Sequence, residues 1–286
     1  MDPVIARKTW RTLEPLHGLI YFAPEAVEEY RAIGLVPTVG GYFASRAAPM
    51  GGVSAEVVMA TFFNFRPQRV RDEIPTAWSL ASPADVVAAR FRAAGRALRG
   101  ILGPAADTEE VREAAALART AALRATEHPE GRPLFGGHAS LDWPDDPLLV
   151  LWHAQSLLRE FRGDGHIAAM TNEGITGIEA LVIHGCTGEI PRGALQSTRG
   201  WTDDEWETAA DGLRCRGWLA ADGSLTDAGR AHRQGVEDRT DVLALPAYEA
   251  LSEDECARLR TLARPLAKAV VESSSFTFTN PGATTG

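Results

Sequence analysis

Predicted helices with a polar residue at the start follow one another along almost the whole chain. Four segments have apolar residues at every third or fourth position and a serine or threonine in front as N-cap: Ser82, Thr108, Thr176 and Thr202. The turn at Asp222-Gly223 is the one place where short extended pieces are expected to pair. The sequence therefore predicts a mainly α-helical fold.

The composition is that of an ordinary globular protein and argues against several classes. The 286 residues are 45% hydrophobic and 23% charged, with a formal net charge of −9. This charge opposes non-specific attraction to nucleic acid, because such binding needs Lys and Arg to neutralise phosphates. The three cysteines are too far apart to predict a disulfide framework or a Cys-x-x-Cys site. With no signal peptide and no long apolar run, the chain is expected in the cytoplasm, away from membranes.

A Pro- and Gly-rich stretch divides the chain into two predicted halves. Residues 131–147 form the predicted linker. The linker separates an N-terminal helical half, 1–130, from a C-terminal half, 148–272. Residues 273–286 are polar and are predicted to be a flexible tail.

The two halves contain similar segments in the same order. APEAVEEYRAIGLVPTVGGYFA matches HAQSLLREFRGDGHIAA, and GVSAEVVMATFFNFRP matches GITGIEALVIHGCTGEIP. The segment that starts at Trp78 matches the segment that starts at Trp201. We interpret these matches as an ancient internal duplication. The alternative is chance similarity among alanine-rich helices.

The second half resembles the MarR-type winged-helix regulators. The resemblance covers residues 165–270 and rests on DEWETAADGLRCRGWL, ADGSLTDAGR, the helix with VEDRTD and the segment from LSEDECARLR. In that family these pieces are the recognition helix, the wing and the two dimerisation helices. The first half would then be a degenerate winged-helix copy. The whole chain is also similar to a poorly characterised actinobacterial family described as MarR-like, with whose pattern we associate REFRGDGH.

The predicted recognition helix departs from a DNA-binding pattern. Between residues 203 and 219, five acidic residues stand against two arginines. Contacts with bases and phosphates need Arg, Lys, Asn or Gln on such a helix, and the predicted wing carries only Arg230. We therefore expect the winged helix to serve as a scaffold and not to bind DNA.

The resemblance also implies where a ligand would bind. MarR-type proteins are dimers whose small ligands sit between the dimerisation helices and the winged lobes. Two copies in one chain imply an intramolecular pseudo-dimer with one asymmetric pocket, in a monomer or a homodimer. The segments GGYFASRAAPM and GDGHIAAM begin the two copies and are expected to face this pocket.

The stretch from Leu157 to His184 has the highest density of chemically capable side chains. The candidate site residues at its start are Arg159, Glu160, Arg162, Asp164 and His166. An arginine here would clamp a carboxylate or phosphate of the ligand. The alternative is a helix end whose charges pair with one another.

Asp164 and His166 are the candidate catalytic pair. Gly163 and Gly165 are predicted to end the preceding helix, which would let both side chains turn away from it. Asp164 would then orient His166 as a general base.

A second candidate group lies in the first half and would complete the pocket wall. It comprises His17, Tyr21, Tyr42, Phe43 and Arg46. His17 and Tyr21 are four residues apart and share a helical face. The alternative is a hydrogen-bonded histidine in an aromatic core. His184 follows an apolar run, which suits a core histidine as well as a pocket residue.

These patterns favour a small-molecule-binding protein, with acid–base chemistry if it is an enzyme. One alternative is a MarR-type ligand-responsive transcription regulator that binds DNA. Another is a haem- or tetrapyrrole-binding protein with a histidine ligand. No His-x-x-x-His spacing, nucleotide-binding loop or hydrolase elbow is present, so no metal site is predicted and the cofactor is left open.

Overall fold

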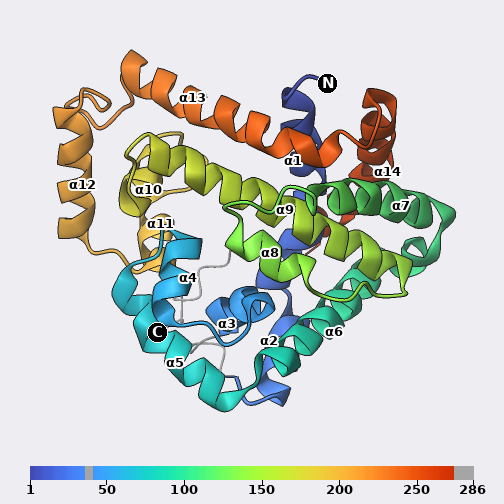
Figure 1. The fold of residues 1–286 in the computed structure, drawn as a ribbon. Helices are drawn as coiled ribbons and strands as arrows, with labels where there is room; N and C mark the ends of the chain where they lie inside the picture. Colours follow the sequence, from blue (N-terminus) through green and yellow to red (C-terminus); the bar gives the residue numbers. More distant parts are fainter. Residues whose placement is uncertain (36–40, 274–286) are drawn as a thin grey trace.

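The computed structural model describes residues 1–35 and 41–273, which form fourteen α-helices and four short 3-10 helices (Figure 1). In this part of the chain, extended backbone pairs only at a bridge between Leu219 and Leu225. The prediction of a mainly α-helical fold is confirmed. The predicted tail from residue 274 onward and residues 36–40 lie outside the described residues.

Helix α9 (Pro147–Asn172) runs through the middle of the molecule (Figure 1). It begins where the Asp146 carboxylate accepts the backbone N–H of Leu148, with Pro147 in the first turn. Its side chains are buried around nearly the whole circumference in the first four turns, as expected for a helix enclosed by other helices. None of the described helices is long and apolar enough to cross a membrane.

The prediction that Gly163 and Gly165 end this helix is wrong. A β-carbon on Gly165 would lie 2.9 Å from Arg132 Nη1 and 3.2 Å from Leu243 Cβ, so glycine allows these neighbours to approach α9. Glycine costs a helix only about 1 kcal/mol, and tertiary contacts offset that cost. Asp164 and His166 therefore lie on one continuous helix, and their side chains point in different directions.

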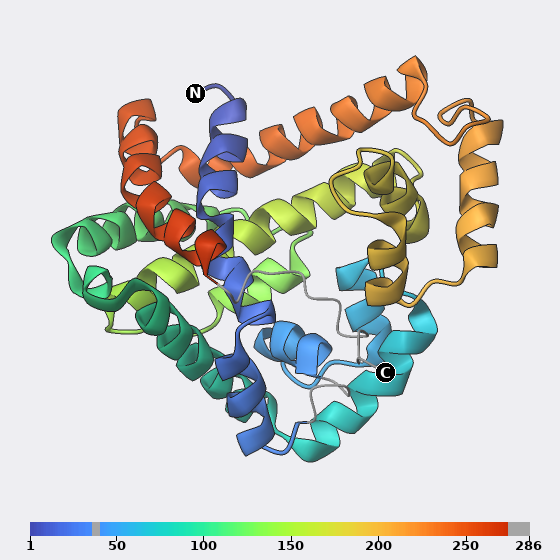
Figure 2. The ribbon, with the colours of Figure 1, turned by 180° about the vertical axis from the view of Figure 1, so that it is seen from behind.

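Three helices pack on the first part of α9 in the largest core: α1 (Val4–Gly18), α6 (Pro83–Leu102) and α7 (Glu109–Ala125). Helix α14 (Glu253–Glu272) belongs to the same core and packs on these three helices. Helix α2 (Pro24–Ala32) packs on α6. Helices α1 and α14 lie side by side on the far face (Figure 2). This core combines residues from both predicted halves.

A smaller aromatic core lies between α3 (Gly41–Ala47), α4 (Ala55–Phe62) and α5 (Pro67–Leu80). Phe43, Phe62 and Phe65 are its buried rings. Helix α8 (Pro133–Ala139) packs on α9 and buries Phe135. The predicted linker therefore contains a packed helix, and the division into domains stays a prediction.

The winged lobe, residues 174–226, holds the third core. It contains α10 (Gly177–Gly185), α11 (Arg192–Arg199), α12 (Asp203–Cys215) and the Leu219–Leu225 bridge. The predicted N-caps of α10 and α12 are confirmed, because Thr176 and Thr202 each form a capping box. Helix α13 (Asp227–Ala244) then returns along α9 (Figure 1).

Candidate functional site

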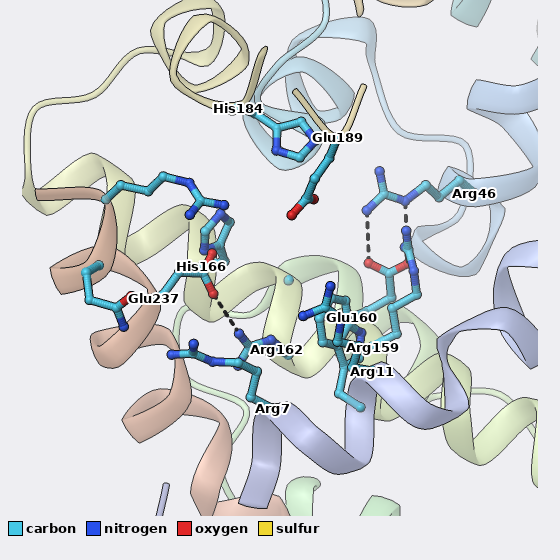
Figure 3. Close-up of a pocket in the computed structure, with 14 residues that line it drawn as sticks. Arg7, Arg11, Arg46, Arg159, Glu160, Arg162, His166, His184, Glu189 and Glu237 are labelled. Atoms are coloured by element: carbon cyan, nitrogen blue, oxygen red, sulfur yellow. Dashed lines mark hydrogen bonds and ion pairs between the residues drawn. The ribbon is translucent and has the colours of Figure 1, made fainter. Parts of the chain in front are cut away.

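A cavity of about 480 Å³ lies where α1, α3, α9 and α13 face the winged lobe (Figure 3). Its lining is rich in charge. The charged and imidazole side chains are Arg7, Arg11, Arg46, Arg159, Arg162, Arg233, Glu160, Glu189, Glu237, His166 and His184. Six arginines thus stand against three glutamates in the lining, while Asp241 and Glu14 pair with some of these arginines from behind the wall.

Glu160 on α9 holds two of these arginines in place. Its carboxylate, 1% exposed, accepts from Arg46 Nη2 at 3.0 Å and from Arg159 Nη1 at 2.7 Å. Burial alone would raise the pKa of Glu160, but Arg46 and Arg159 outweigh it and hold the pKa well below its ordinary value. Glu160 is therefore ionised at neutral pH and orients both guanidinium groups.

Asp241 on α13 holds two more arginines from the other side. This buried carboxylate accepts from Arg162 Nη1 at 2.7 Å and from Arg7 Nε at 2.7 Å. Arg162 also donates to Glu237 at 3.2 Å and lies over the Trp10 ring, 4.9 Å from its centroid. Two buried carboxylates thus position four arginines before any ligand arrives.

The remaining two arginines of the cavity are Arg11 on α1 and Arg233 on α13. Within residues 1–35 and 41–273, neither guanidinium makes a hydrogen bond or an ion pair with a side chain. Their charges are therefore available to a ligand.

Thr240, on α13, orients His166. The Thr240 hydroxyl donates to the backbone oxygen of Val236 at 2.7 Å, so it must accept from His166 Nδ1, 2.9 Å away. Nδ1 therefore carries the proton, and Nε2 has the lone pair. Burial lowers the pKa of His166, and the neighbouring Arg162 and Arg233 lower it further, so the ring is neutral at pH 7.

The turn between α11 and α12 is docked against the first half of the chain. The backbone oxygen of Arg199 accepts the N–H of Arg66 at 3.0 Å, and Trp201 Nε1 donates to the backbone oxygen of Asn64 at 2.9 Å. Arg66 Nε also donates to Glu205, in the first turn of α12, at 3.0 Å. We call these contacts the turn joint.

Helices α11 and α12 follow each other with a short turn between them, which is the order of elements in a helix-turn-helix unit. Figure 1 shows both helices in the winged lobe. The sequence pattern of a helix-turn-helix family matches residues 6–277. The chain belongs to this helix-turn-helix family. No match was found among curated proteins or among solved structures.

The helix-turn-helix part of the predicted resemblance is therefore confirmed. In this helix-turn-helix protein, the side of α12 that points away from the core is acidic. Its exposed side chains include Asp203, Asp204, Glu207 and Asp211. Arg192 and Arg214 pair with this side, but both are themselves partly exposed at the surface.

Asp164 and His166 do not form the predicted pair. Asp164 Oδ2 accepts the backbone N–H of Phe135 at 2.9 Å, at the start of α8, and does not line the cavity. Burial raises the pKa of Asp164 to about 7. The geometry expected for the pair is wrong because both residues lie on the continuous α9, where positions two apart do not face each other.

Most of the other predicted residues of α9 and α10 line the cavity. Arg159, Glu160, Arg162, His166 and His184 do so, and Arg46 joins them from α3. Arg46 also donates to the Tyr42 hydroxyl at 3.5 Å. Burial raises the pKa of Tyr42, but Arg46, Arg199 and Arg159 outweigh it and lower the pKa.

His17, Tyr21, Tyr42 and Phe43 do not line this cavity. His17 is fully buried and has a partner on each ring nitrogen: Ser156 Oγ at 2.8 Å on Nδ1 and Tyr21 OH at 3.0 Å on Nε2. Phe43 belongs to the aromatic core. This is the alternative that the sequence left open, a hydrogen-bonded histidine beside aromatic residues.

Several residues of the site were not predicted from the sequence. Arg7, Trp10 and Arg11 on α1 and Arg233 and Glu237 on α13 line the cavity, and Thr240 and Asp241 on α13 bond to lining residues from behind. Each set has the spacing of three or four residues that places side chains on one helical face. In the sequence, the sign that could have found them was this row of polar residues on the face of a helix that also packs on the core. Among residues 1–35 and 41–273, no group of three or more His, Cys, Asp or Glu side chains could hold a metal ion.

Proposed function

We propose that this protein binds a small organic anion in the cavity between α9, α13 and the winged lobe. The observation that carries the proposal is the pair of buried carboxylates, Glu160 and Asp241, which hold four arginines in position. Arginines fixed in this way lose little conformational freedom on binding. Arg11 and Arg233 then add two charges without an ion pair among the described residues.

His166 gives the cavity an acceptor beside its cationic groups. With Nδ1 bonded to Thr240, the imidazole presents Nε2 as a hydrogen-bond acceptor for a ligand O–H or N–H. The same nitrogen is placed to act as a general base if the protein is an enzyme. Thr240 would then be the positioning residue, in the role first expected of Asp164.

Regulation of transcription through DNA binding is the competing function, because the chain belongs to a helix-turn-helix family. Recognition helices insert their N-terminal residues into the major groove. Here the first turns of α12 expose Asp203, Asp204 and Glu207, which would repel phosphates. The turn joint also covers the end of α11. We therefore propose that the lobe that carries the helix-turn-helix unit serves as a wall of the ligand site, to which it contributes His184 and Glu189.

We also propose the MarR-like duplication as the origin of this arrangement. The similar sequence segments fall on α4 and α10 and again on α6 and α12, although α6 has 20 residues and α12 has 13. The proposal rests on this order of elements, because no residue of α4–α7 lines the cavity. A haem or tetrapyrrole ligand stays a prediction.

Titration calorimetry with succinate, hexanoate and phenyl phosphate tests the proposal directly. We expect at least one of these anions to bind the full chain, and Arg233→Gln to weaken that binding by about tenfold or more, since a charge-assisted hydrogen bond is lost. Arg258→Gln is the matched control, because Arg258 pairs with Glu113 at the surface and does not line the cavity. Absence of anion binding, together with a mobility shift of duplex DNA, would overturn the proposal.

A further inference from the structure

A second cavity adjoins the arginine-rich one inside the winged lobe. It has a volume of about 190 Å³ and lies between α9, α10 and α13. Its walls are mainly aliphatic and include Met170, Ile175, Leu181, Ile183 and Val236, all of them buried. This lining contrasts with that of the first cavity, where charged side chains predominate.

Four side chains line both cavities: His166, His184, Arg233 and Glu237. They stand where the charged space meets the aliphatic space, and Figure 3 shows three of them, His166, His184 and Glu237, around one side of the larger cavity. A ligand held by the arginines would therefore have an apolar extension directly beside its head group.

The aliphatic cavity is partly open and adjoins the charged one. Apolar side chains that line an open hollow stay in contact with water, so covering them with an apolar group is favourable. Residue 180, on the wall of this cavity, is an alanine. A larger apolar side chain at this position of α10 would fill the space. A space of this kind next to a charged pocket suits the apolar part of a ligand.

We propose that the ligand is an amphiphilic anion, with a carboxylate or phosphate head among the arginines and an aliphatic tail in the second cavity. This inference rests on the proposed function and adds the class of ligand. Apart from the imidazoles that it shares with the first cavity, the wall holds aliphatic side chains and no Phe, Tyr or Trp ring, which favours an alkyl tail over a stacked aromatic one. At about 30 Å³ for a water-sized group, 190 Å³ accommodates a tail of about six carbon atoms.

A homologous series of straight-chain acids, from acetate to decanoate, tests the tail. Calorimetry on the full chain should show Kd falling by about fourfold for each added methylene, as expected for burial of a CH₂ group. The gain should stop once the second cavity is full. Alkyl phosphates of the same lengths decide between the two head groups, and alkylammonium ions should not bind.

The substitution Ala180→Leu tests binding of the tail separately from binding of the head group. Filling the second cavity should raise the Kd of octanoate by tenfold or more and leave that of acetate or succinate unchanged. Ala194→Leu is the matched control, since Ala194 is also half-buried in the winged lobe and lines neither cavity.

The outcomes separate this inference from the proposed function. The inference of an amphiphilic ligand is wrong if short anions bind with a Kd that is independent of chain length, or if Ala180→Leu leaves octanoate binding intact. In either case the proposed binding of a small anion is retained. If no anion of any length binds, both are wrong. Tighter binding of alkylammonium ions than of acids would also overturn the inference.

Discussion

Glu160 and Asp241 determine the electrostatics of the cavity at the scale of single residues. Each carboxylate is about 1% exposed and each is shared by two arginines. A buried charge is tolerated only when it is paired and hydrogen-bonded. Removing either carboxylate takes the buried partner from two guanidinium groups and leaves them with more exposed carboxylates such as Glu14 and Glu237, so the effect should fall on stability as well as on binding.

We expect Glu160→Gln to lower the free energy of unfolding by about 3–5 kcal/mol, the usual cost of breaking a buried ion pair on one side. Urea denaturation of the two proteins measures it. Glu113→Gln is the control, because its partner Arg258 is at the surface, 2.6 Å away, and loss of such a pair costs about 1 kcal/mol or less. Equal effects of the two substitutions would contradict the role assigned to Glu160.

Asp164 should make stability depend on pH. Its pKa is raised to about 7 in the folded protein, against about 3.9 in an unfolded chain. Between these values the folded state binds more protons, so the stabilisation is complete below about pH 4 and is lost as the pH rises towards 7. Asp164→Asn can still accept the Phe135 N–H and stays neutral, so its free energy of unfolding should fall less than that of the unmodified protein from pH 5 to pH 8.

Asp145→Asn is the control for this measurement, because it removes a carboxylate that is exposed at the surface. It should leave the difference between pH 5 and pH 8 as it is in the unmodified protein. An unchanged pH dependence in Asp164→Asn would show that another group is responsible.

Helix α9 is the element on which the sequence and the structure differ most. The starts of α6, α10 and α12 could be predicted, because each begins at a Ser or Thr N-cap and has apolar residues at helical spacing. The continuity of α9 could not, since it depends on Arg132 and Leu243, which are distant in sequence. The hydrogen bond between Thr240 and His166 could not be predicted either, because these residues are also distant in sequence.

The two glycines of α9 should respond to alanine in opposite directions. At Gly163 the nearest atom to a new β-carbon is Glu160 Oε2 at 3.5 Å, so Gly163→Ala should stabilise the helix by about 0.5–1 kcal/mol. At Gly165 the contacts of 2.9 Å and 3.2 Å require displacement, so Gly165→Ala should destabilise the protein by about 1–3 kcal/mol. Thermal unfolding of the pair tests this, and the same sign for both would refute it.

At the scale of the whole molecule, the turn joint and α9 connect the winged lobe to the rest. The joint is formed by a few hydrogen bonds, in which Trp201 donates to Asn64 and Arg66 donates to Arg199 and Glu205. Arg69 adds bonds to the backbone oxygens of Ser197 and Thr198. Helix α9 contributes to both the largest core and the core of the winged lobe. The joint is thus the weaker of the two connections.

Trp201→Ala should loosen the winged lobe before the rest of the protein. It removes the bond to Asn64 and a half-buried ring, at a cost of about 2–3 kcal/mol. Hydrogen exchange should accelerate in α10–α12 and stay slow in α6 and α7. Trp143→Ala, at the other end of the molecule beside His153, is the control. Uniform acceleration over all helices would count against a separate lobe.

The passage of α9 through two cores has a consequence for how the chain can be divided. The largest core takes α1, α6 and α7 from before residues 131–147 and α9 and α14 from after them. A protease that cuts between α7 and α8 should therefore yield two fragments that co-elute, each of which keeps the other folded. The segments of the chain that resemble a repeat are therefore not segments that fold independently.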